Sequence, residues 1–192
     1  MQDFLFYLQL GWEHIISKDA LDHQLFVLVL VAAYSYKDWK KILLLVTAFT
    51  IGHSITLALS VLDIIRISSK WVEFLIPLTI LITALDNIIM KNKQNSLMKM
   101  NYYLALIFGF IHGMGFANTA RMMIAKEQNI FMPLLGFNIG LELGQIVVVL
   151  AILLVFFLLT GIFKMQRKDW IMFTSSAVFA LSLQMVLERL PF

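Results

Sequence analysis

The sequence predicts an all-α, polytopic transmembrane helical bundle with about six spans and an N-terminal interfacial helix. Its hydrophobic fraction is 60% and its mean hydropathy is +0.85, whereas charged residues make up only 14%, against about a quarter in soluble domains. Its apolar runs are long enough to cross a hydrocarbon core about 30 Å thick. We therefore expect one transmembrane domain, residues 1–192, in a lipid bilayer.

Polar residues interrupt the N-terminal segment and the first span. Residues 4–16 are mostly apolar with a few polar positions, a pattern that favours a helix lying at the membrane interface. The first span, about 21–36, has a continuous apolar run only at 25–36, which covers about 18 Å as a helix. Counting back from the end of this run places Asp22 and His23 inside the bilayer, beneath the N-terminal helix.

Five further apolar runs predict the remaining spans. Their ranges are about 42–62, 71–90, 102–122, 131–159 and 170–186. The loops after the first, third and fifth spans hold nine of the 15 basic residues. By the positive-inside rule these loops face the cytoplasm, so both termini are expected outside.

Charge and cysteine content exclude several function classes. The net charge of +3 comes mostly from short loops, where basic residues set topology, so no nucleic-acid partner is expected. The chain has no cysteine, so a bound metal would be held by nitrogen and oxygen ligands. The sequence is compatible with a homo-oligomer as well as with a monomer.

Ionisable side chains inside the predicted spans form the candidate site. Placing one such side chain near the bilayer centre costs at least a few kcal/mol, so each of these residues is treated as a candidate functional residue. His53, His112 and Glu142 lie about ten or eleven residues into their spans, hence at similar depth. Asp22 and His23 lie somewhat nearer the outside. We expect all of these groups to meet in one pocket.

Imidazole and carboxylate groups are suitable ligands for a divalent transition metal such as Ni, Co, Zn or Fe, whose charge offsets the burial of a carboxylate. The predicted ligands are His23, His53 and His112, with an oxygen from Asp22 or Glu142 and with His14 as an entry ligand. Polar neighbours at helical spacing are expected to fix the imidazole tautomers. These neighbours are Thr50, Ser54, Asn138 and Gln145.

Five short segments carry the residues named above. They are 11–15, 21–26, 47–57, 108–117 and 137–145. Together they resemble the HupE/UreJ family of bacterial membrane proteins, in a divergent branch, over nearly the whole chain. The resemblance implies a small multi-pass protein of the bacterial inner membrane that moves nickel or cobalt. The positions it carries over are His14, Asp22, His23, His53, His112 and Glu142.

Two functions can use such a site. The first is a divalent metal-ion permease of the nickel/cobalt type, in which the outer groups capture the ion and the mid-membrane groups hold it. The alternative is an intramembrane metallohydrolase with Glu142 or Asp22 as general base. The scarcity of polar residues on the inner halves of the spans favours the enzyme. A bis-histidine haem carrier using His53 and His112 and a metal-free assembly subunit also stay open.

Two further acidic residues are interpreted as structural. Glu73, at the outer start of the third span, is interpreted as an interfacial charge in preference to an outer gate. Asp86 is interpreted as a paired or hydrated group near the cytoplasmic end, with an exit-side cation ligand as its alternative.

Overall fold

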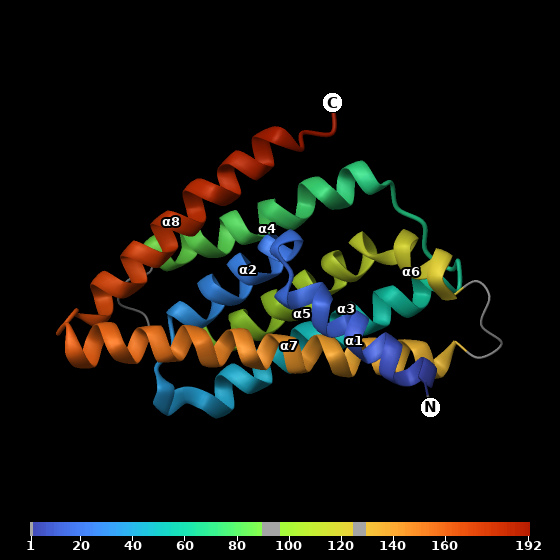
Figure 1. Cartoon of the computed structure of the whole chain (residues 1–192). Coiled ribbons are helices and arrows are strands. Elements are labelled where there is room, and N and C mark those ends of the chain that lie inside the picture. Colours follow the sequence, from blue (N-terminus) through green and yellow to red (C-terminus); the bar gives the residue numbers. More distant parts are fainter. Residues whose placement is uncertain (1, 90–96, 125–129) are drawn as a thin grey trace.

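The computed structural model describes residues 2–89, 97–124 and 130–192, and every regular element in this part is a helix (Figure 1). The predicted all-α class is therefore confirmed. In chain order the elements are α1 (Gln2–Ile16), η1 (Lys18–Ala20), α2 (Leu21–Ala32), η2 (Tyr36–Asp38), α3 (Trp39–Val61), α4 (Ser69–Ile89), α5 (Leu97–Gly115), α6 (Ala117–Ile124), α7 (Phe131–Phe157), η3 (Leu158–Ile162, a π-helical turn) and α8 (Arg167–Glu188).

Four helical stretches of the described chain are long and apolar enough to cross a membrane. They are Tyr36–Val61, Ser69–Ile89, Phe131–Ile162 and Arg167–Glu188. They correspond to the predicted spans 42–62, 71–90, 131–159 and 170–186. The chain therefore has the architecture of a helical membrane protein, although the predicted count of six spans is not confirmed.

The other two predicted spans differ from the observed helices. Predicted span 21–36 is α2, which has 12 residues. It covers about 18 Å, so it is too short to cross the bilayer by itself. Predicted span 102–122 is divided at Phe116 between α5 and α6. Gly115 directly precedes this break, and glycine is among the poorest helix formers.

The N-terminal helix α1 packs along α7, and the two backbones are in direct contact (Figure 1). A Cβ atom on Gly140 of α7 would lie 1.9 Å from the carbonyl oxygen of Leu8, and one on Gly11 of α1 would lie 1.9 Å from that of Phe137. Small residues permit such close approach between membrane helices. The predicted place of residues 4–16 at the membrane interface stays a prediction.

Glycines also join α3 to α5. A Cβ atom on Gly109 would lie 2.1 Å from the carbonyl oxygen of Phe49, and one on Gly113 would lie 2.4 Å from that of His53. These contacts lie beside His53 and His112. The close approach therefore fixes the separation of the two helices where they carry imidazoles.

Helices α4 and α8 pack on each other, and both contact α2. The beginning of α4 and the C-terminus of the chain lie at the same end of this pair, where the rings of Trp71 and Phe192 have centroids 6.3 Å apart. Helix α2 also contacts α7 and α1, so it lies between the α4–α8 pair and the α1–α7 pair. This end of the bundle carries the pocket described below.

Candidate metal centre

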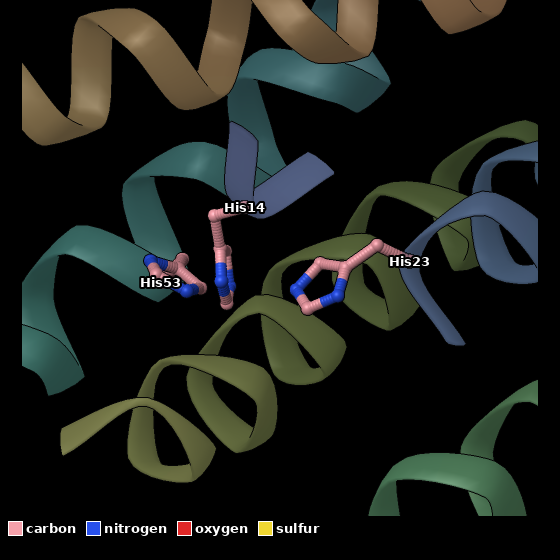
Figure 2. A group of neighbouring side chains, drawn as sticks. All are labelled: His14, His23 and His53. Atoms are coloured by element: carbon pink, nitrogen blue, oxygen red, sulfur yellow. The ribbon is translucent and has the colours of Figure 1, made fainter. Parts of the chain in front are cut away.

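Three imidazoles from three different helices meet inside the bundle. They belong to His14 on α1, His23 on α2 and His53 on α3, and each offers a ring nitrogen within 4.8 Å of the other two (Figure 2). The ring centroid of His14 lies 4.7 Å from that of His23 and 6.0 Å from that of His53. The side chain of His53 is fully buried and that of His23 nearly so. This spacing allows the three nitrogens to share one metal ion after small side-chain rotations.

A fourth imidazole, His112 of α5, lies against this group. Its ring centroid is 4.8 Å from that of His23, and only 1% of the residue is exposed. The Nδ1 atom lies 2.8 Å from the carbonyl oxygen of Phe108. A carbonyl only accepts hydrogen bonds, so Nδ1 carries the proton and donates. Nε2 is then left with its lone pair, which is the form that binds a metal.

Asp22 orients His23 in the same way. One carboxylate oxygen of Asp22 lies 2.9 Å from Nδ1 of His23 and accepts the backbone N–H of His23 at 2.8 Å. The carboxylate accepts from Nδ1–H, so Nε2 of His23 also keeps its lone pair. A carboxylate that bonds the far nitrogen of a ligating histidine raises the ligand's basicity and holds its ring. In this structure Asp22 is placed to support a ligand.

Five ring nitrogens of these four imidazoles have no hydrogen-bond partner among the described residues. In the described part of the chain, the buried atoms without a partner include His14 Nε2, His23 Nε2, His53 Nδ1, His53 Nε2 and His112 Nε2. Each unsatisfied buried polar group costs about 1–3 kcal/mol. Several such atoms directed into one small volume fit a divalent metal, because coordination satisfies them together. The donor set is entirely nitrogen, which suits Ni, Co and Zn.

Glu142 does not join the imidazole group. Its Oε1 accepts a hydrogen bond of 2.8 Å from the Thr47 hydroxyl on α3. Thr47 precedes His53 by six residues, which is about 9 Å along the helix axis. Among the described residues, His14, His23 and His53 have nitrogen atoms close enough to one another to share a metal ion. The structure therefore places Glu142 in a separate α3–α7 contact.

The predicted polar neighbours occupy different places. Thr50 donates to Gln145 Oε1 at 3.1 Å, so these two side chains bond across α3 and α7. The Ser54 hydroxyl donates to the carbonyl oxygen of Thr50 at 2.6 Å, within its own helix. Asn138 donates to the Leu134 carbonyl oxygen, and its side chain interacts with His53. Asn138 therefore lies beside an imidazole of the group, although no hydrogen bond to a His53 ring nitrogen is present in the described structure.

Aromatic rings enclose the imidazoles, a feature that the sequence analysis missed. Phe116 has its centroid 4.4 Å from that of His14 and stacks on Phe137 at 4.8 Å and 12°. Phe49 lies 5.3 Å from His112, also between ring centroids. The sequence contains 16 phenylalanines, and these three lie in segments 47–57, 108–117 and 137–145, so the family resemblance was the signal that could have found them. These apolar rings lower the dielectric around the imidazoles, which strengthens the electrostatic interactions there.

A pocket of about 210 Å³ leads into the imidazole group. His14, His23 and His112 line its inner part, and the exposed residues Asp19 and Glu73 line its outer part. The site is therefore buried in the bundle but connected to the surface.

The Asp22→Asn substitution is expected to weaken metal binding by about 10–100-fold, the usual loss when a ligand's supporting group is changed. The amide is a weaker acceptor for the His23 Nδ1–H, so the ring is held less firmly. Titration of purified protein with Co²⁺, followed by visible absorption, measures the dissociation constant. Asp169→Asn, a change at an exposed acid on α8, is the matched control. Equal dissociation constants for Asp22→Asn and wild type would contradict the supporting role of Asp22.

The family model described as HupE / UreJ protein matches residues 1–189 of the chain. No curated protein and no solved structure matches the chain.

Proposed function

Because the chain belongs to the HupE/UreJ family, we propose that it binds a divalent transition metal of the nickel or cobalt type inside the membrane and transports it. The observation that carries the proposal is the convergence of His14, His23 and His53 with unpartnered ring nitrogens. We place the protein in the bacterial inner membrane with both termini outside, on the basis of the family and of the loop charges.

The ion is the transported substrate in this proposal. It exchanges its water ligands for the neutral imidazoles of His14, His23 and His53, with His112 beside them as a further nitrogen ligand. The carboxylate of Asp22 and the carbonyl oxygen of Phe108 keep the far nitrogens of two rings protonated. Their lone pairs therefore stay directed at the ion.

Release requires the imidazoles to separate, and in this proposal they separate at the joint between α1 and α2. His14 lies before this joint and His23 after it. Gln24 Nε2 lies 3.0–3.3 Å from the carbonyl oxygens of Ile15, Ile16 and Ser17, so it caps the end of α1. A change of backbone angles at η1 would move His14 away from His23 without unfolding either helix.

Metal flux into proteoliposomes tests this function. Vesicles that contain the wild-type protein and an internal metal-sensitive dye are expected to take up Ni²⁺ or Co²⁺ in a saturable manner. Vesicles with His112→Ala are expected to lose most of this uptake, because one nitrogen of the group is removed. Elemental analysis of the same preparations gives the bound metal. Stoichiometric metal without flux would contradict transport.

The pocket supports a second candidate, an intramembrane metallohydrolase. Three imidazoles leave a fourth metal position for water or substrate, and the pocket reaches the imidazoles from the surface. Of the two predicted bases, Asp22 lines this pocket, whereas Glu142 bonds to Thr47. Asp22 is therefore the base that this reading favours. Metal binding without flux, the outcome that contradicts the permease, is the outcome expected of the enzyme.

A further inference from the structure

The outer part of the pocket carries charged side chains from three separate elements. Asp19 comes from η1, Glu73 from α4 and Arg189 from the C-terminal end of α8. Asp19 and Glu73 are exposed, and Arg189 is partly exposed. In the described residues the structure records no ion pair for any of the three. Two carboxylates and one guanidinium thus face the same opening.

This opening connects directly to buried metal-binding atoms. His23 and His112 line the same pocket, although they are only 5% and 1% exposed. The Nε2 atoms of both are without hydrogen-bond partners in the part of the chain that the structure describes. The acidic groups therefore lie between the surface and the two Nε2 atoms that could bind a metal.

The pocket is large enough for a hydrated ion. Its volume is about 210 Å³. A water molecule needs about 10–15 Å³ of such space, so the six waters around a divalent cation need about 60–90 Å³. An ion can therefore enter with its water ligands and exchange them for imidazoles inside.

We propose that this pocket is the entry route of the divalent cation, in which Asp19 and Glu73 attract the hydrated ion and Arg189 opposes its entry. The inference rests on the proposed function, because it concerns the path to the same site. Charges of one sign in a cleft with low-dielectric walls raise the local concentration of counter-ions and the rate of association. The guanidinium acts in the opposite sense and sets how strongly cations accumulate.

The rate of metal loading tests the route. Wild-type protein in nanodiscs of zwitterionic lipid is mixed with Co²⁺, and the cobalt–imidazole absorption is followed by stopped flow at low and high salt. Glu73→Gln and Asp19→Asn are each expected to slow loading by about threefold at low salt and together by about tenfold. Arg189→Gln is expected to accelerate it. The final amount of bound cobalt is expected to equal that of wild type, since no imidazole is changed.

Two controls separate this inference from the proposed function. Glu188→Gln, at an exposed acid next to Arg189 that does not line the pocket, is expected to load at the wild-type rate. If wild type takes up no cobalt, the proposed function falls and the entry route falls with it. If wild type loads and the double variant Asp19→Asn/Glu73→Gln loads equally fast with the same salt dependence, only the entry route is overturned.

Blocking the pocket provides a second readout. The chain contains no cysteine, so a single introduced thiol can be labelled selectively. Ser17 lines the pocket, and its neighbour Lys18 is exposed outside it. A neutral bulky methanethiosulfonate label on Ser17→Cys is expected to remove most of the loading rate, whereas the same label on Lys18→Cys leaves it unchanged. Equal loading by the two labelled proteins would overturn the route.

Discussion

The His53→Ala variant is expected to purify without stoichiometric metal, whereas the wild type is expected to hold about one ion per chain. His53 is fully buried, and neither of its ring nitrogens has a hydrogen-bond partner within the described chain. Changing a group that only supports a ligand costs about 10–100-fold in affinity, so removing a ligand is expected to cost more. Elemental analysis after dialysis against a weak chelator measures the difference.

The same variant is expected to lose stabilisation by metal. An ion present at 100 times its dissociation constant stabilises the folded state by about 2.7 kcal/mol. Addition of Ni²⁺ should therefore raise the melting temperature of wild type but not of His53→Ala. Thr56→Ala, a buried change one turn away on α3, is the control that should keep the metal response. A His53→Ala protein that retains both full metal and the full thermal shift would contradict the assignment.

The Gly140→Ala variant is expected to lose metal affinity by at least about tenfold, although Gly140 is not a ligand. The added Cβ atom would lie 1.9 Å from the Leu8 carbonyl oxygen and 2.9 Å from the Trp12 backbone nitrogen. Backbone atoms cannot rotate away, so α1 must move off α7 and carry His14 away from His23. Overpacking of this kind typically costs about 1–3 kcal/mol, more than the roughly 1 kcal/mol that alanine gains over glycine in a helix.

Gly161→Ala provides the matched control. It changes a glycine in η3, directly after α7, where the nearest atom to a Cβ would be Phe157 Cε2 at 3.9 Å. This variant is expected to bind metal and to melt like wild type. Thermal unfolding and Co²⁺ titration of both variants give the two quantities. Wild-type affinity and stability in Gly140→Ala would contradict the claim that the α1–α7 contact positions His14.

The four long helices could be predicted from the sequence because hydropathy and flanking charges determine their ends. Helices α3, α4, α7 and α8 begin and end within a few residues of the predicted spans. The break at Phe116 could not be predicted in this way, because the apolar run continues across it. The path of α1 along α7 was also missed. It depends on backbone contacts at Gly136, Gly140 and Gly144, whereas the composition of α1 alone indicates an interfacial helix.

The candidate site could be predicted in part, because the sequence gives the depth of a residue within its span. Counting residues from the end of a span gives depth, and His23, His53 and His112 do lie together. Depth does not give the direction in which a side chain points or the tilt of its helix. Glu142 has a similar count but bonds to Thr47. His14, expected only as an entry ligand, lies inside the group because α1 packs against α7.

Metal K-edge X-ray absorption of the purified protein, loaded with one equivalent of Ni²⁺, tests most directly whether imidazoles from separate helices hold one ion. A nitrogen-rich coordination shell with the outer-shell scattering of three or more imidazole rings is the predicted spectrum, matching the three histidines whose nitrogens converge. A spectrum of oxygen ligands alone, or protein that retains no nickel, would contradict it.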